Sequence, residues 1–154
     1  MRVIVDANIV FSGILRSEGK IGDLLINSEG IFKFISPDFL RIEVQRHHEK
    51  LIKISKLTLD QVLEAEFQIC KSINFISDEQ IGKENWDMAE ELVYDIDIKD
   101  VSYIAFSKQF KAKVWSGDKS LIKGLANKGF TNFISTNELW DLRQVKLQKY
   151  KFRS

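Results

Sequence analysis

The sequence predicts an α/β fold in which one parallel β-sheet carries helices on both of its faces. Short segments typical of strands recur along the chain, and segments with helical periodicity lie between them. The first strand-like segment contains Val3, Ile4 and Val5, which are all β-branched, as expected of a strand buried on both faces. Strands that alternate with helices in this way form βαβ units and hence a parallel sheet.

Five segments are expected to form the strands of this sheet. The weakest of them is residues 73–77, and no segment of the chain has the composition of a linker, a repeat or a low-complexity tract. In chain order, the expected strands are Arg2–Val5 and residues 32–36, 73–77, 113–116 and 132–135.

The helices are expected between and after these strands. Residues 21–28 follow a loop that contains Gly13 and Gly19. Ser36 and Pro37 have the residue types of an N-cap and a first helical position, which predicts a helix that begins at Pro37. Further helices are expected at residues 84–94 and 100–110, after Asp118 and after Thr136.

One helix has a stronger signal. Thr58 and Gln61 have the spacing of a capping box, and apolar residues follow at helical spacing. We therefore expect these apolar side chains, Cys70 included, to face the core. The expected core positions of this helix are Leu59, Val62, Leu63, Phe67 and Cys70.

Composition and length limit the classes of protein to consider. The 154 residues suffice for one domain with a sizeable core, and we expect it to span residues 1–142, followed by a basic tail at 143–154. No apolar run approaches the roughly 20 residues of a membrane span, and Asp6 interrupts the only candidate for a signal peptide. A single cysteine excludes an internal disulfide and fits a reducing cytoplasm.

Charge is unevenly distributed, although the net charge is only +1. Residues 78–100 contain nine acids against Lys83 and Lys99, whereas residues 143–154 contain five basic residues and no acid. Each run is typical of a solvated helix face. The basic tail, which has aromatic residues between its lysines, also has the composition of a surface that contacts a phosphate backbone.

Four acids occupy positions that a parallel sheet would bring to one edge. Asp6 and Asp118 follow strands, Asp100 precedes a helix, and Glu43 lies beside the apolar positions of the helix after Pro37. The carboxyl ends of parallel strands and the helix starts that follow them meet at the edge where ligands bind. Taken singly, Asp6, Asp100 and Asp118 could equally be helix N-caps, and Glu43 a solvated helix residue.

Carboxylates that meet at one edge repel one another. Two unit charges about 4 Å apart cost about 4 kcal/mol at an effective dielectric constant of 20. Either some of the acids take up protons or cations lie among them. Oxygen ligands without cysteine suit Mg²⁺ or Mn²⁺, and such ions support phosphodiester hydrolysis.

An ordered set of motifs resembles the PIN domain, and most closely the branch related to toxin ribonucleases of type II toxin–antitoxin pairs. The motifs are DAN at 6–8, SPDFLRIE at 36–43, DIKD at 97–100 and WSGDK at 115–119. The resemblance implies an α/β/α sandwich and a metal-dependent ribonuclease that acts on single-stranded RNA and leaves a 5′-phosphate and a 3′-hydroxyl. Toxins of this branch are blocked by a small antitoxin protein, and homodimers are common in the family.

Residue by residue, the resemblance implies a catalytic and metal-binding quartet of Asp6, Glu43, Asp100 and Asp118 with Mg²⁺ or Mn²⁺ as cofactor. Asn8 and Ser116 match supporting polar positions, and Asp97 is the alternative to Asp100 as the third acid. The helix after Asp100 is more polar than is usual in the family.

Other side chains near these acids have less specific interpretations. Lys99 and Lys119 flank two of the acids and are candidates for contacts with substrate phosphates, or are solvated lysines. His47 and His48 are adjacent, so they point about 100° apart on a helix. They cannot easily share a metal ion, and we expect both on the helix surface.

Two other classes of function remain open from the sequence. The first is a non-catalytic PIN-like domain that binds RNA or protein. The second is a phosphatase or phosphoacceptor domain with Asp6 as nucleophile, although such sites usually have a second acid directly after the first strand, which DANIV lacks.

Overall fold

Five parallel strands form one sheet at the centre of the molecule, in the order β3-β2-β1-β4-β5. The computed structural model describes residues 1–153. The strands are β1 (Arg2–Val5), β2 (Lys33–Pro37), β3 (Ile73–Ile76), β4 (Lys113–Trp115) and β5 (Phe133–Ile134). All five expected strands are present, and β1 is central, with Val3, Ile4 and Val5 fully buried.

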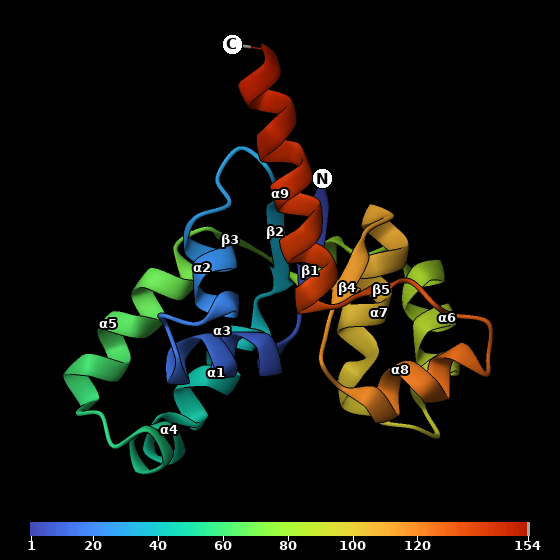
Figure 1. Ribbon diagram of the computed structural model, residues 1–154. Helices are drawn as coiled ribbons and strands as arrows, with labels where there is room; N and C mark the ends of the chain where they lie inside the picture. The colour runs from blue at the N-terminus through green and yellow to red at the C-terminus, as the bar shows by residue number, and fades with distance from the viewer. Residues whose placement is uncertain (154) are drawn as a thin grey trace.

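Helices pack around this sheet and connect its strands. Figure 1 shows α1–α5 on the side of β3, α6–α8 on the side of β4 and β5, and α9 running past the sheet. The helices are α1 (Ala7–Leu15), α2 (Lys20–Ile26), α3 (Phe39–Arg46), α4 (His48–Ser55), α5 (Leu59–Cys70), α6 (Lys83–Val93), α7 (Val101–Phe110), α8 (Lys119–Ala126) and α9 (Thr136–Arg153), with 3₁₀ turns η1 (Asp78–Gln80) and η2 (Ile98–Asp100). The prediction of an α/β/α sandwich is confirmed. No helix within residues 1–153 is both long and apolar enough to cross a lipid bilayer.

Helix α1 corrects one prediction, because it occupies the segment expected to be a loop around Gly13. Asp6 caps this helix by accepting a hydrogen bond from the Ile9 N–H at 3.0 Å. A β-carbon on Gly13 would lie 3.1 Å from the Ile69 Cδ1 atom of α5. The glycine therefore permits close packing of α1 against α5, and it does not mark a turn.

The strand β2 continues through Pro37, so the predicted helix start at Ser36–Pro37 is wrong. Pro37 lies opposite Ile76 of β3, and the Asp38 N–H continues the pairing by donating to the Ile76 carbonyl at 3.0 Å. Ser36 donates its hydroxyl to the Val5 carbonyl at 2.8 Å, so it joins β2 to β1 instead of capping a helix. A proline is tolerated at such a strand end because its fixed φ is close to extended values.

The capping box of α5 is confirmed, but its apolar stripe is only partly buried. Thr58 and Gln61 exchange both hydrogen bonds of the box, at 2.9 and 3.2 Å. Val62 is buried as expected, whereas Leu59, Leu63 and Phe67 are exposed, Phe67 at 63%. Burial raises the pKa of the half-buried Cys70 thiol to about 12, so it remains protonated and is a poor nucleophile.

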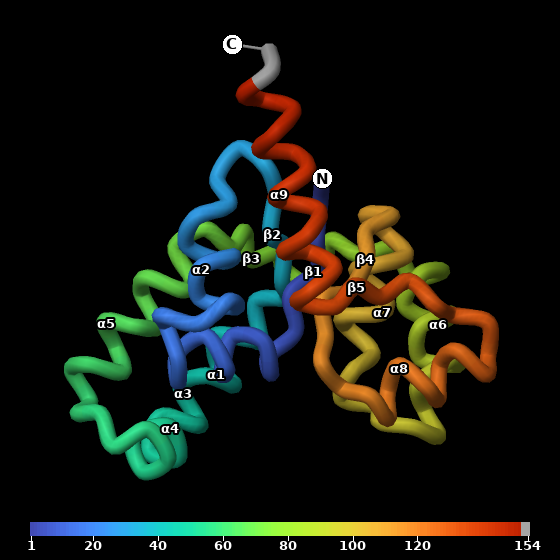
Figure 2. The backbone as a smooth tube through the Cα atoms, viewed as in Figure 1, coloured from blue at the N-terminus to red at the C-terminus, as the bar shows by residue number. Residues whose placement is uncertain are grey.

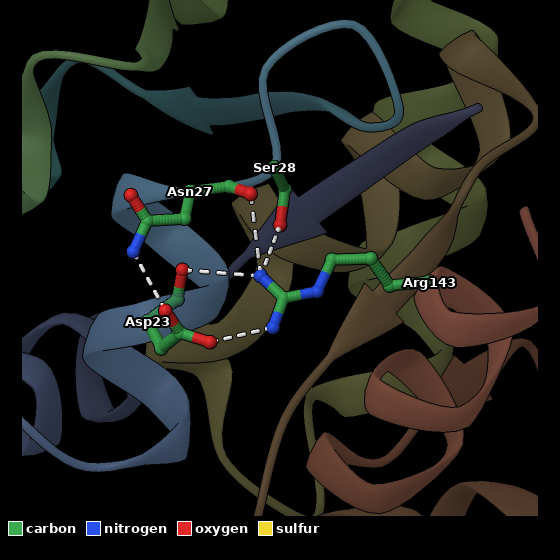
Figure 3. A network of polar contacts seen from close by, with 4 residues as sticks. All are labelled: Asp23, Asn27, Ser28 and Arg143. Atoms are coloured by element: carbon green, nitrogen blue, oxygen red, sulfur yellow. Dashed lines mark hydrogen bonds and ion pairs between the residues drawn. The ribbon is translucent and has the colours of Figure 1, made fainter. Parts of the chain in front are cut away.

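Helix α9 is attached to the body by Arg143, the first residue of the predicted basic tail. Arg143 is only 4% exposed, and its guanidinium donates to α2 and to the residues after it (Figure 3). The Nη2 atom contacts Asp23 Oδ2 at 2.5 Å, and Nη1 lies 3.3 Å from three acceptors, the Asp23 and Asn27 carbonyls and the Ser28 hydroxyl. Beyond this anchor, α9 continues without a break and projects past the sheet (Figure 2). Ser154, the last residue of the predicted tail, lies outside the described residues.

Candidate active site

A cavity of about 500 Å³ lies at the carboxyl edge of the sheet and collects the predicted acids. Asp6 follows β1, Glu43 lies on α3, Asp100 precedes α7, and Asp118 precedes α8. All four line this cavity, together with Asp97. Residues far apart in the sequence therefore meet at the strand ends, as the parallel topology requires.

Asp6 is the most buried of the acids, at 6% exposure. Burial raises the pKa of its carboxyl group to about 6, and the negative charge of Asp118 adds to this shift. The Ser116 hydroxyl and the Ile9 N–H oppose it by hydrogen bonding. Asp6 therefore serves as an N-cap and as a member of the acid cluster at the same time.

Asp100 precedes α7 but does not cap it, because its side chain forms no capping hydrogen bond. Burial raises the pKa of Asp100 to about 7, and the charge of Asp97 is the next largest cause. Asp6, Asp118 and Glu43 raise the pKa of Asp100 further, so its carboxyl group is close to all of the acids of the cavity. A plain capping role does not account for this residue.

Asp97 and Asp118 each use one carboxylate oxygen to cap a local turn. The Lys99 N–H donates to Asp97 Oδ1 at 3.0 Å, and the Leu121 N–H donates to Asp118 Oδ1 at 3.1 Å. Ser116 is buried after β4 and accepts a hydrogen bond from the Asp118 N–H at 3.1 Å. These bonds fix the orientation of the two acids and leave the second carboxylate oxygen of each available to a ligand.

The remaining predicted residues divide between the cavity and the surface. Asn8 and Lys99 are exposed and line the cavity, and half-buried Glu43 lines it from α3. Lys119 is exposed at the start of α8 and is not among the residues that line the cavity.

Five lining residues were not predicted as part of the site: Ala7, Phe11, Arg46, His47 and Tyr103. Arg46 and His47 lie three and four positions after Glu43, and Tyr103 lies three positions after Asp100. Residues three and four apart share one helix face. This spacing from the acids was the signal in the sequence that could have found Arg46, His47 and Tyr103.

His47 corrects the expectation of a surface histidine. It is half-buried between α3 and α4, and its ring centroid lies 5.1 Å from that of Phe11. Its Nδ1 atom lies 2.7 Å from the Glu43 carbonyl oxygen. Because a carbonyl oxygen only accepts, Nδ1 carries the proton, and Nε2 is the ring nitrogen that a neutral His47 offers as an acceptor. His48 instead contacts Glu66 at 2.7 Å.

Tyr103 brings a buried hydroxyl group to the same cavity. Burial, followed by the charges of Glu43 and Asp6, raises the pKa of Tyr103 above its ordinary value, so the phenol stays protonated. Its oxygen has no hydrogen-bond partner among the described residues; the nearby Ala7 N–H lowers the pKa but does not reach hydrogen-bonding geometry. Tyr103 therefore places a buried, unpaired hydroxyl close to the acids of the cavity.

The donors in the cavity fit a hard divalent cation in kind. They are carboxylate oxygens without a thiol, the set that Mg²⁺ and Mn²⁺ prefer. Within residues 1–153, however, no three acidic, histidine or cysteine side chains already stand at the spacing of ligands to one ion. Binding an ion therefore requires these side chains to move toward it, and the ion would offset their mutual repulsion.

Comparison with known families agrees with this geometry. A family model described as a PIN domain matches residues 4–149, which is nearly the whole chain. The chain belongs to the PIN-domain family. No curated protein sequence matches it. The PIN domain is a nuclease-type fold, and its nucleases typically use divalent metals, so the acidic cavity of this PIN domain is the candidate active site.

Proposed function

We propose that this PIN domain is a metal-dependent endoribonuclease that hydrolyses phosphodiester bonds in single-stranded RNA. One observation carries the proposal: Asp6, Glu43, Asp100 and Asp118 line a single cavity at the carboxyl edge of the sheet. The raised pKa values of Asp6 and Asp100 support it, because carboxylates with such values gain a great deal from a nearby positive charge.

In this proposal the quartet holds one or two Mg²⁺ or Mn²⁺ ions. When bound, such an ion neutralises the carboxylates, activates water and stabilises the charge that develops on the leaving oxygen. Asp6 and Asp118 are held by their capping bonds and offer ligands of fixed direction. Glu43 lines the same cavity and is a further ligand or the group that orients the attacking water.

The other lining residues fit an anionic substrate. Arg46 and Lys99 place positive charge at the exposed rim, where a phosphate would enter. Tyr103 adds a neutral, unpaired hydroxyl behind the lining of the cavity. A water molecule attacks phosphorus, the bond from phosphorus to the 3′-oxygen breaks, and that oxygen takes up a proton, which yields a 5′-phosphate and a 3′-hydroxyl.

We extend the proposal to the biological role of a toxin, on the likeness of the four sequence motifs to toxin ribonucleases. A small antitoxin protein would then block the cavity. Homodimerisation is part of the same proposal.

The test is cleavage of single-stranded RNA with Mg²⁺ or Mn²⁺ and with EDTA, by the wild-type protein and by Asp100→Asn. We expect cleavage only with metal and only by the wild-type chain, and we expect calorimetry to show Mn²⁺ binding that the variant weakens. A protein that binds RNA but neither Mn²⁺ nor Mg²⁺, and that cleaves nothing, would instead be the non-catalytic binding domain.

A further inference from the structure

A second charged surface lies at the opposite edge of the sheet from the acids. Arg2 begins β1 and Lys33 begins β2, and the two residues are paired in the register of these parallel strands. Both are exposed. They line a cavity of about 710 Å³, together with Lys71 before β3. Neighbouring strands are about 4.8 Å apart, so the amino ends of the strands form a row of cations.

Helix α9 extends this surface beyond the sheet. The Lys146 Nζ atom lies 5.8 Å from the centroid of the Phe32 ring, directly before Lys33. Burial lowers the pKa of the Met1 amino group, and the positive charges of Lys146, Lys33 and Arg2 lower it further. These three cations therefore lie near the same amino group. Lys149 follows Lys146 at helical spacing on α9, and the C-terminal part of this helix projects beyond the sheet (Figure 1). We refer to Arg2, Lys33, Lys146 and Lys149 as the distal basic surface.

Opposing charge is scarce at this edge. Glu29 lines the same cavity, but none of the four cations of the distal basic surface takes part in the ion pairs found in the described part of the chain. From Arg143 to Lys151 the helix contains no acid. Tyr150 follows Lys149 of the distal basic surface and is 59% exposed. Cations without an acidic partner beside an exposed aromatic ring are the combination that binds single-stranded nucleic acid, through phosphates and base stacking.

We propose that the distal basic surface binds the phosphate backbone of RNA and anchors a long substrate whose cleaved segment lies in the acidic cavity at the other edge. The proposal rests on the RNA substrate of the proposed function. The length of β1, four residues or about 13 Å, is the least distance between the two edges. An RNA chain must pass around the molecule to reach both, so short RNA cannot use the anchor.

The test compares two double variants of equal net charge. Lys33→Glu with Lys146→Glu alters the distal basic surface, and Lys50→Glu with Lys53→Glu alters exposed lysines on α4 as the matched control. Binding of a labelled oligouridylate of about twenty nucleotides is measured in EDTA over a range of salt concentrations. Cleavage of this RNA and of an oligonucleotide of about four nucleotides is measured with Mn²⁺, and thermal unfolding verifies that each variant is folded.

We expect the Lys33 and Lys146 double variant to bind the long RNA about tenfold more weakly or worse, with a salt slope reduced by roughly 0.7 for each phosphate that the protein no longer neutralises. Cleavage of the short RNA is unchanged, and the control variant resembles the wild type. Equal weakening by both double variants, or no binding by the wild type in EDTA, would overturn the proposal. So would displacement of the RNA by a polyglutamate peptide at equal charge, because the surface would then bind acidic protein. Selective weakening without cleavage of either RNA would retain the anchor and refute the ribonuclease.

Discussion

The carboxyl groups of Asp6 and Asp118 repel each other across the acidic cavity, although each also caps the helix that follows it. Both acids therefore combine a structural role with a position in the candidate active site. The two roles can be separated by substitution, because an amide retains the acceptor of the cap and removes the charge.

Asp6→Asn separates the two roles most directly. We expect loss of metal-dependent RNA cleavage and, in EDTA at neutral pH, an equal or higher free energy of unfolding. Asparagine still accepts the hydrogen bond of the Ile9 N–H. Removing the charge should raise the free energy of unfolding by at most roughly 3 kcal/mol, since the pKa of Asp6 is raised from 3.8 to about 6 and each pKa unit corresponds to about 1.36 kcal/mol. Urea unfolding and a cleavage assay measure both. Lower stability with full cleavage would identify Asp6 as a cap only.

The stability of the metal-free protein should fall as pH rises from about 4 to about 7. The folded pKa values of Asp6 and Asp100, about 6 and about 7, lie above the ordinary aspartate value of 3.8. In this window the folded chain binds more protons than the unfolded chain, so the free energy of unfolding decreases with pH. Urea midpoints in EDTA test this, and added Mn²⁺ should remove most of the decrease. In the Asp6→Asn variant, a decrease as steep as in the wild type would contradict the contribution of Asp6.

Tyr103→Phe removes the unpaired hydroxyl and little else. If that hydroxyl donates to substrate, we expect kcat to fall about tenfold or more, since a hydrogen bond to a charged group contributes roughly 1.5–3 kcal/mol. Stability should be unchanged or slightly higher, because the hydroxyl has no partner among the described residues. Single-turnover cleavage and thermal unfolding are the measurements. Reduced stability with normal kcat would assign Tyr103 to the core alone.

Arg143→Leu should lower the free energy of unfolding by about 2–3 kcal/mol. This value is at or below the usual loss for a broken buried ion pair, because the Asp23 side chain is 35% exposed and keeps contact with water. Asp23→Asn should cost less, since Nη1 retains the Asn27 carbonyl and the Ser28 hydroxyl as acceptors. Urea unfolding of the two single variants and the double variant gives their coupling energy. Cleavage of short RNA should persist in each folded variant. Loss of this cleavage would show that the Arg143–Asp23 ion pair affects the active site.

The sheet was predictable because its strands are short, apolar and separated by helical patterns. A central strand that is buried on both faces is the arrangement that best suits the β-branched side chains of Val3, Ile4 and Val5. Helix α1 was missed because Gly13 is a helix breaker in isolation, and only the proximity of Ile69 explains its presence in a helix. The exposure of Phe67 was also hidden, because helical spacing indicates a shared face without showing what covers that face.

The acids of the site were predictable from topology, since strand ends and helix starts share an edge. The sequence could not reveal which of Asp97 and Asp100 lies deeper. In the structure Asp97 is exposed, whereas Asp100 is half-buried and has the raised pKa. To predict His47 and Tyr103 as well, one would have to consider, for each acid, the residues three and four positions further along the helix, because they share its face.

The central position of β1 has a consequence for synthesis on the ribosome. Its neighbour β4 and the acids Asp100 and Asp118 leave the exit tunnel long after Asp6 does. A nascent or truncated chain that ends before Asp118 therefore cannot assemble the full set of acids at this edge. The acidic cavity is complete only once Asp118 has left the tunnel and β4 has paired with β1, so shorter copies of this polypeptide lack the candidate active site.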